Sequence, residues 1–443
     1  MRQRGYILLL GLLVATGLMT LVTVGLSRSM VELSIAQRDI AYQEAFHVAE
    51  AGVDAGVRWL KTQPSPPVCD TAISADPQDG FSAWCELEPF VGPQPVGNGT
   101  YTVVVEPDDG NPSTDTELYR VRSTGMVGGV TRTTSLILKS ESFSYYQQFL
   151  EGDSGVWITG SGANGPVHTN HQFVMYGNPS FYDRASSVAT DINCLYGGPC
   201  NPHYYGGKAF GQPHIDLPLT SDVSGPMARL INHSEQLDGD TTIEISGNTL
   251  LVTNAAKSWI NHPLSVDSTP AVFVKSGTLS ITGGTLDGKL TLGSDNNIVI
   301  NGPVRYACDP TISRWDPDCL DGDGKVAYND DVLGLVAEHN VMVSNAAPTT
   351  NMRVDAAVLT VEGKYYFEGY QSTPTRGYSY RLGSFVSKEA GYFWSMDFST
   401  MRCVGGYCSS YWSYDRRLRN LAPPYYPTTG KFNPAMWEEP PNP

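Results

Sequence analysis

Hydrophobic and polar positions divide the chain into segments of different character. Tyr6–Leu26 is an uncharged apolar run that is long enough to cross a bilayer as a helix. No proline interrupts the chain before Pro64, and apolar residues beyond the run recur at steps of three and four, which is typical of one helix face. We therefore predict a transmembrane and stalk helix within residues 6–65, apolar in its first half and amphipathic in its second. The apolar face of the second half comprises Tyr42, Phe46, Ala49, Val53, Gly56 and Leu60.

Short segments of alternating apolar and polar residues follow the predicted helix. Turns rich in Asp, Gly, Asn and Pro separate these segments, as in a series of short strands. We predict strands at Gly99–Glu106, Glu117–Ser123 and Val130–Lys139. With the helix they indicate an α+β module, in which residues 66–142 form an antiparallel sheet on the amphipathic half of the helix.

Residues 143–410 consist of short aliphatic segments between Gly, Asn and Asp corners. The segment Gly277–Gly293 is typical of successive faces of a parallel β-helix, in which each turn buries a few aliphatic side chains and stacks on the next. We predict a mainly-β domain of this β-helix or solenoid type. Because no strict period is visible, a β-sandwich is the competing architecture. Residues 411–443 are predicted to be a tail rich in proline and aromatic residues. The predicted strands are Thr242–Ile245, Leu250–Thr253, Ala271–Val274, Thr278–Thr282, Lys289–Leu292, Asn297–Ile300, Val341–Ser344 and Ala356–Val361.

Composition narrows the classes of function. A length of 443 residues suggests about two or three domains. An apolar content of 41% excludes a disordered chain, and a charged content of 17% excludes a mainly coiled-coil protein. With 29 basic and 45 acidic residues, the net charge of −16 repels phosphate backbones. We therefore expect no general nucleic-acid binding.

The N-terminus predicts the cellular location. Arg2 and Arg4 precede the apolar run, so the positive-inside rule keeps the N-terminus in the cytoplasm and exports the chain beyond Leu26. The apolar core is longer than that of a cleaved secretory signal, and residues 27–30 form a poor cleavage site. We expect a single-pass protein of the inner (cytoplasmic) membrane, for which a plain signal anchor is the simplest interpretation.

Three stretches resemble PilX-type minor pilins, which are accessory proteins of type IV pilus assembly. Arg4-Gly5-Tyr6 is similar to the end of a short prepilin leader. Residues 41–54 (AYQEAFHVAEAGVD) resemble the N-terminal segment of this family, and residues 119–132 (YRVRSTGMVGGVTR) resemble its sheet. The resemblance implies that prepilin peptidase removes residues 1–5 by cutting between Gly5 and Tyr6. Leu10 stands where major pilins carry Glu, and because PilX-type proteins often lack this Glu, the resemblance implies an accessory subunit.

The larger domain resembles an uncharacterised C-terminal domain that follows PilX-like N-termini in some bacteria. This likeness indicates how the chain is organised and implies no activity. The segments that carry it are residues 165–170 (GPVHTN), 331–337 (DVLGLVA), 355–359 (DAAVL), 414–418 (YDRRL) and 423–430 (PPYYPTTG).

These resemblances imply a pilin-like accessory (minor) subunit of a type IV pilus or related secretion filament. It would be anchored by its N-terminal helix and would display a large distal domain for assembly or adhesion. The implied partners are other pilins, pilus assembly proteins, prepilin peptidase and the membrane, with a glycan or other surface ligand for the distal domain, and the final location is the pilus or cell surface. The alternatives are a membrane-tethered β-helix enzyme acting on polysaccharide and a stand-alone anchored adhesin. Paired carboxylates and the Gly-x-Ser-x-Gly pattern are not found, so we assign no catalytic residues and favour a protein that is not an enzyme.

Eight cysteines follow the membrane run, where the compartment permits oxidation. Cys-x-x-Cys knuckles, which a zinc site would require, are absent from the sequence. We predict local disulfides that join nearest neighbours, with free thiols as the alternative. The predicted pairs are Cys69/Cys85, Cys194/Cys200, Cys308/Cys319 and Cys403/Cys408.

An acidic segment resembles an EF-hand-like calcium loop. Asp321, Asp323 and Asp330 match the loop's third, fifth and twelfth positions, and a glycine follows Asp323 where the loop turns sharply. The first position is Cys319, which cannot bind calcium, so Asp318 or Asp316 would have to replace it. We predict a weak calcium site made by Asp318, Asp321, Asp323 and Asp330, against the alternative of an acidic surface turn.

Histidines and aromatic residues form two further groups of candidates. His168 and His171 are three residues apart, with His203 and His214 beyond them; a metal site would need a third ligand nearby, so a polar loop is the favoured interpretation. An exposed subset of the C-terminal aromatic residues would form an adhesive surface, because Tyr and Trp suit glycan and protein partners. This group comprises Tyr365, Tyr366, Phe367, Tyr370, Tyr378, Tyr380, Tyr392, Phe393, Trp394, Tyr407, Tyr411, Trp412 and Tyr414.

Calcium is expected to stabilise the chain through the loop at Asp321–Asp330. The melting temperature should rise in millimolar calcium relative to chelator, since an ion that binds only the folded loop shifts the folding equilibrium. With its first ligand missing, the loop should bind with Kd near ~10⁻⁴–10⁻³ M. Asp323→Ala should abolish the shift. If the wild type shows neither a shift in Tm nor heat of binding, the segment is an acidic turn.

Overall fold

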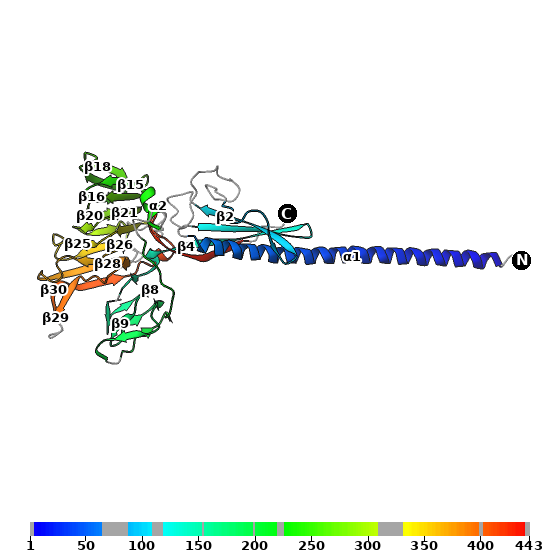
Figure 1. Ribbon diagram of the computed structural model, residues 1–443, viewed down its shortest axis with the longest axis horizontal. Helices are drawn as coiled ribbons and strands as arrows, with labels where there is room; N and C mark the ends of the chain where they lie inside the picture. The colour runs from blue at the N-terminus through cyan, green and yellow to red at the C-terminus, as the bar shows by residue number, and fades with distance from the viewer. Residues whose placement is uncertain are drawn as a thin grey trace.

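The computed structural model describes residues 4–63, 87–108, 118–152, 155–197, 200–218, 226–308, 331–397 and 402–438. A long helix, α1 (Arg4–Lys61), extends from the N-terminus. Its C-terminal half packs on an antiparallel sheet, and a large, mostly β region with parallel sheets lies beyond that end of the helix (Figure 1). The structure therefore confirms the prediction of a long N-terminal helix followed by a mainly-β region.

The two halves of α1 have different surroundings. Side chains from Leu9 to Ile40 are exposed, whereas Ala45, Ala49 and Leu60 are fully buried. The change follows the sequence, which turns from continuously apolar to amphipathic along the helix. Only a one-sided apolar stripe can pack on a sheet while the opposite face stays in water. The amphipathic half is therefore the part of the helix that folds together with the rest of the chain.

The sheet on α1, called here the first sheet, has antiparallel neighbours throughout. Its core side chains face the helix, so that Val53 of α1 packs with Val103 and Val121. The strand order is β1 (Gln94–Val96), β2 (Gly99–Asp108), β3 (Leu118–Val127), β4 (Val130–Ser142) and β31 (Thr428–Glu438).

The last strand of the first sheet differs from the prediction of a tail over residues 411–443. Residues 428–438 form β31, which pairs with β4 and places Phe432 with its ring centroid 5.2 Å from that of Tyr119. Without β31, β4 would present an open edge of unpaired backbone groups. The preceding domain also extends past residue 410, because a strand continues to Ser413.

The distal β-domain (residues 148–413) consists of short strands that pair in parallel with strands one turn further along the chain. In its first half-stack (residues 148–209), each turn contributes one strand to each of three faces. One face has β5 (Gln148–Leu150), β8 (Val167–Thr169), β11 (Ala185–Ser187) and β14 (Lys208–Ala209), in this order. The second has β6 (Val156–Ile158), β9 (Phe173–Tyr176) and β12 (Ile192–Cys194), and the third has β7 (Gly162–Ala163), β10 (Ser180–Phe181) and β13 (His203–Tyr204).

The second half-stack (residues 226–413) begins with a capping unit. This unit contains α2 (Pro226–Asn232), β15 (Glu235–Asp238) and the antiparallel strands β16 (Thr241–Gly247), β17 (Thr249–Asn254) and β18 (Trp259–Ser265). From β15 a parallel series continues through β19 (Ala271–Lys275), β21 (Lys289–Ser294), β24 (Val332–Ala337), β26 (Met352–Thr360) and β28 (Thr375–Ser387). A second series starts at β16 and β20 (Leu279–Leu286) and includes β22 (Ile298–Ile300), β23 (Val304–Tyr306), β25 (Val341–Val343) and β27 (Tyr365–Phe367). An antiparallel pair, β29 (Trp394–Asp397) and β30 (Arg402–Ser413), ends this half-stack.

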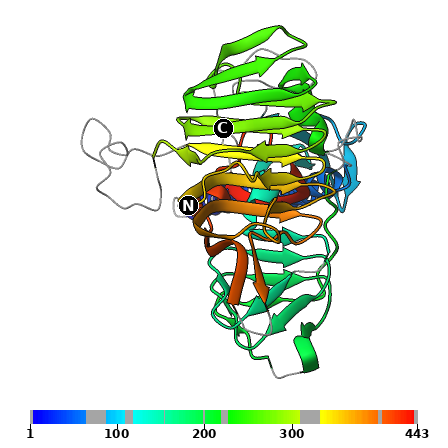
Figure 2. The same ribbon diagram turned by 90° about the vertical axis from the view of Figure 1, so that its left-hand side faces the viewer.

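The two half-stacks meet at a strand pair that is remote in the sequence. Phe385 of β28 is paired in parallel with Gln148 of β5. The chain therefore joins the stack at its middle, runs to one end, crosses over and returns from the other end. Figure 2 shows this arrangement, with the cyan and blue-green strands of the first half-stack below the green and yellow strands of the second. The spatial order of the turns is thus a permutation of their order in the sequence.

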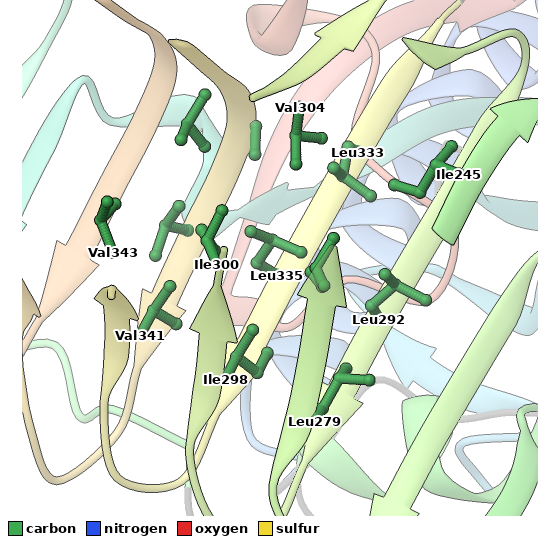
Figure 3. Close-up of a cluster of buried hydrophobic side chains, with 14 of the residues drawn as sticks. Ile245, Leu279, Leu292, Ile298, Ile300, Val304, Leu333, Leu335, Val341 and Val343 are labelled. Atoms are coloured by element: carbon green, nitrogen blue, oxygen red, sulfur yellow. The ribbon is translucent and has the colours of Figure 1, made fainter. Parts of the chain in front are cut away.

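Successive turns bury aliphatic side chains at matching positions. Leu279, Ile298 and Val341 are lateral neighbours on β20, β22 and β25, and all three are fully buried (Figure 3). The residue between two core positions is less buried in each strand, as alternation along a strand requires. The next row of the same column holds Ile281, Ile300 and Val343.

Unequal turn lengths conceal this repeat in the sequence. Asn340 hydrogen-bonds to Asn297, 43 residues before it, and accepts a hydrogen bond from the Lys364 backbone, 24 residues after it. Elsewhere, Ser276 and Asp295 occupy neighbouring turns and are only 19 residues apart. The longest of these intervals includes residues 309–330, which lie outside the described residues.

A glycine in β3 sets the distance between helix and sheet. A Cβ atom at Gly125 would lie 2.3 Å from the Ala45 carbonyl oxygen and 2.5 Å from the Ala49 backbone nitrogen. Both distances are shorter than real Cβ contacts, and the atoms are backbone, which cannot move aside as a flexible side chain would. The backbones of β3 and α1 are therefore in direct contact.

Gly125→Ala should separate α1 from the first sheet and lower the free energy of unfolding by about 1–3 kcal/mol, as overpacking usually does. Gly25→Ala is the matched control, because nothing lies within 4 Å of a Cβ atom at that position. Thermal denaturation of the full chain in detergent should give a lower Tm for the Gly125 variant alone. Equal melting temperatures for both variants would contradict the direct backbone contact.

Candidate functional site

From Leu9 to Leu26, α1 presents a continuous apolar surface. Leu9, Leu13 and Leu21 are each more than 60% exposed. By its length and composition this helix is able to span a membrane, and its most apolar window is 0% buried. A helix that meets water on its outer side would carry polar side chains there. This surface is therefore suited to lipid or to the apolar faces of other helices.

The predicted processing site lies at the start of this helix. Gly5 and Tyr6 belong to the first turn of α1, so a cut between them would leave the rest of the helix intact. Leu10 is 64% exposed and places an apolar side chain on the helix surface.

Two arginines from residues 119–132 have partners in this part of the structure, one on α1 and one within the first sheet. The Arg132 guanidinium lies 4.2 Å above the centroid of the Tyr42 ring, and its Nη1 also contacts the Tyr42 hydroxyl. Arg122 donates from Nη2 and Nε to Oε1 of Glu106, at 2.6 and 2.8 Å. The Glu106 side chain is 2% exposed and the Arg122 side chain is 38% exposed, so only the carboxylate of this pair is buried in the sheet. Both arginines thus have structural partners.

A polar cavity of about 350 Å³ lies at the junction of the first sheet and the distal β-domain. Glu141 and Lys431 reach it from the ends of β4 and β31. Arg184 and His168 reach it from the first half-stack. The remaining lining residues are Tyr145, Tyr146, Pro166, Ser186, Gln212 and Asn433.

His168 is fixed in one wall of this junction cavity by hydrogen bonds to both ring nitrogens. Its Nε2 lies 3.1 Å from Asn170 Oδ1, which also accepts from the Ile215 backbone, so Nε2 is the donor. Its Nδ1 then accepts from Ser186 Oγ, at 2.9 Å. The side chain is 2% exposed, and burial lowers the pKa of His168 to about 4 despite the opposing hydrogen bond to Asn170. The imidazole is therefore neutral near pH 7.

Ser186, His168 and Asn170 have the order of a nucleophile, a base and an orienting group, but His168 is poorly matched to the role of the base. A general base works best with a pKa close to the working pH, and that of His168 is well below it. Ser186 is also within reach of the Val167 carbonyl, at 3.2 Å, as expected for a side chain on a stacked strand. The three residues serve as a rigid polar wall.

The other predicted histidines do not join His168 in a metal site. His214 lies between Glu151 and Asp216, at 2.9 and 3.1 Å, and His203 stacks on Tyr205 with a centroid separation of 5.9 Å. Within the described ranges, no group of three or more His, Cys, Asp or Glu side chains is arranged to hold a metal. The calcium candidates Asp318, Asp321, Asp323 and Asp330 lie outside those ranges.

Two of the predicted cysteine pairs are disulfides in the structure, namely Cys194–Cys200 and Cys403–Cys408. Cys308 is also disulfide-bonded, but its predicted partner Cys319 lies outside the described residues. Cys69 and Cys85 lie outside them as well.

The C-terminal aromatic residues divide between core and surface. Tyr365, Phe367 and Tyr407 are buried in the distal core. Tyr378, Tyr380 and Tyr411 are between 44% and 54% exposed. The rings of Tyr380 and Tyr411 stack with centroids 5.4 Å apart across β28 and β30.

Sequence reasoning singled out His168 but missed the cavity around it. Glu141, Arg184 and Lys431 come from three distant segments, and no local motif marks any of them. Only the return of the C-terminal strand β31 to β4 brings Lys431 beside Glu141.

Comparison with known proteins gives a distant structural likeness. No family model matches the chain, and no curated protein matches it. Among solved structures, the competence-associated pilin ComZ from Thermus thermophilus is similar, at 15% identity and a TM-score of 0.36. The match covers 90% of this chain and 97% of that chain. A likeness this distant assigns neither a family nor an activity.

His168 should make the fold sensitive to acid. Its pKa is about 4 in the folded chain, against an ordinary value of 6.5 in the unfolded chain, so the unfolded chain takes up a proton first as the pH falls. The stability present above about pH 6.5 is therefore lost between about pH 6.5 and 4, to the extent of about 3 kcal/mol.

His168→Gln should reduce the fall in Tm between about pH 7 and 4.5, whatever its effect at pH 7, because the glutamine cannot take up this proton. His203→Gln, which changes an exposed histidine of the same half-stack, is the control and should keep the fall of the wild type. A fall of equal size in all three proteins would mean that His168 is not the acid-sensitive group.

Proposed function

We propose that this protein is a pilin-like accessory (minor) subunit of a type IV pilus or a related secretion filament. The division of α1 carries the proposal, because its first half exposes an apolar surface while its second half is buried on the first sheet. Lipid can cover the apolar half before assembly, and the helices of neighbouring subunits can cover it afterwards. The resemblance of residues 41–54 and 119–132 to PilX-type minor pilins supports the same role.

Leu10 supports an accessory position within the filament. After removal of residues 1–5 by prepilin peptidase, Leu10 would be the fifth residue, where major pilins carry a Glu. Leucine offers no charge to pair with the next subunit, so recruitment through this position is weakened. A subunit with this property suits a place at or near the tip.

The distal β-domain supports display rather than repetition along the filament wall. We class it as a parallel β-helix, because its strands pair in parallel turn after turn on both sides of the β28–β5 pair. A domain of this size is difficult to repeat along a tightly packed helical array. The exposed tyrosines Tyr378, Tyr380 and Tyr411 provide a surface for a glycan or protein partner.

The proposed mechanism is assembly and not catalysis. Other pilins and pilus assembly proteins are the partners of α1, first in the inner membrane and then in a pilus at the cell surface. Calcium is proposed to order the acidic segment between Cys308 and Val332, which adjoins β24.

The chain should be found in sheared and purified filaments of its own bacterium, with a mature N-terminus at Tyr6 by mass spectrometry. Val14→Asp should remove it from the filament fraction, because a charge at the centre of an apolar helix costs about 2.5–3.5 kcal/mol on insertion. Gln43→Asp, beyond the apolar run on the same helix, should leave the filament fraction unchanged.

A chain that begins at Met1 in a peptidase-competent cell and is absent from filaments would overturn the proposal. That result would favour a stand-alone anchored adhesin.

A further inference from the structure

We propose that the junction cavity binds a small oxyanion between Arg184 and Lys431. A carboxylate on an acidic sugar and a free inorganic anion such as phosphate share this chemistry. The proposal is independent of filament assembly, since the residues concerned belong to the first sheet and the distal β-domain.

Two cations, Arg184 and Lys431, line the junction cavity. Neither the Arg184 guanidinium nor the Lys431 ammonium group takes part in a hydrogen bond or ion pair with any residue of the described chain. Burial lowers the pKa of Lys431, with Arg184 adding to the effect and Glu141 opposing it. An anion bound beside Lys431 would oppose this lowering of its pKa, because it would stabilise the charged ammonium group. Arginine and lysine are the side chains that bind carboxylates and phosphates most strongly.

The carboxylate in the cavity is already occupied by neutral donors. Glu141 Oε1 accepts from the Tyr146 hydroxyl at 2.9 Å and from Thr429 Oγ1 at 3.1 Å. Glu141 Oε2 accepts from Asn433 Nδ2 at 3.2 Å. The charged residues of the lining are thus two cations and one carboxylate, and the carboxylate is already hydrogen-bonded to neutral donors. Their net charge is positive, so a ligand with a single negative charge would neutralise the cavity.

The remaining walls suit a polar organic ligand. His168 is neutral near pH 7 and held at both nitrogens, so it adds no charge and does not move aside. Tyr145 and Gln212 add an aromatic ring and an amide to the lining. The volume of about 350 Å³ lies at the lower end of the range for small-molecule sites, roughly 300–1,000 Å³. Arg184 is exposed, which leaves the cationic side open to solvent.

The two cations belong to different parts of the chain. Lys431 lies on β31 of the first sheet, and Arg184 directly precedes β11 of the distal β-domain. An anion between them would therefore link the two parts of the exported region and stabilise their junction, as any ligand that binds only the folded state does.

Isothermal titration calorimetry of the full chain in detergent tests the proposal, at pH about 7.5 and about 0.15 M salt. The probes are sodium D-glucuronate, inorganic phosphate and the neutral sugar D-glucose. At least one of the two anions should bind with one-to-one stoichiometry, and D-glucose should not. Tighter binding of glucuronate identifies an acidic sugar as the source of the oxyanion, and tighter binding of phosphate identifies a free inorganic anion.

Arg184→Gln and Lys431→Gln should each weaken binding by at least about tenfold, the usual effect of losing one charge-assisted hydrogen bond. Lys388→Gln, at an exposed lysine of the distal β-domain, is the matched control and should bind like the wild type. A Tm equal to that of the wild type in the absence of ligand would show that each variant is folded. Absence of binding by both anions, equal binding of D-glucose, or unchanged affinity in both cavity variants would overturn the proposal.

Discussion

The parallel pairing of β28 with β5 is the interaction on which the arrangement of the chain beyond α1 depends. Each half-stack of the distal β-domain would otherwise end in a strand with unpaired backbone groups, and such edges invite association with other chains. The pairing of Phe385 with Gln148 turns two separate stacks into one. It also places the point where the chain joins the stack, after β4, close to the point where it leaves, after β30. Strand β31 can therefore return to lie beside β4.

That return determines where polar groups gather. Glu141 and Lys431 meet at the end of the first sheet because β4 and β31 are neighbours, and His168 and Arg184 face them from the adjacent half-stack. A permuted stack thus creates a cavity between parts of the chain that a sequential stack would keep apart. The same connection fixes the distal β-domain at the end of α1 that is buried, opposite the apolar half (Figure 1).

Local periodicity explains what could be predicted from the sequence. The apolar residues of α1, such as Ala49 and Val53, recur every three or four positions, which identifies a helix. Apolar and polar residues alternate within Gly99–Glu106 and Val130–Lys139, which identifies strands. The order of the turns depends instead on contacts between residues such as Gln148 and Phe385, and no local pattern reports these contacts. The same limit applies to the cavity. His168 drew attention as one of two nearby imidazoles, whereas Arg184 and Lys431 are ordinary surface cations until the fold brings them together.

The exposed apolar side chains of α1 require an apolar environment outside the folded chain. Burial of one large aliphatic side chain is worth roughly 1.5–3 kcal/mol. The stretch from Leu9 to Ile40 exposes more than a dozen such side chains, so the total exceeds the net stability of an ordinary domain, about 5–15 kcal/mol. Lipid and neighbouring helices are almost equally apolar, so the difference between these two environments is set by packing and polar contacts and is small by comparison. On the proposed function, a subunit would therefore leave the membrane for a filament without unfolding, and a single position such as Leu10 would then act on the small difference between the two environments.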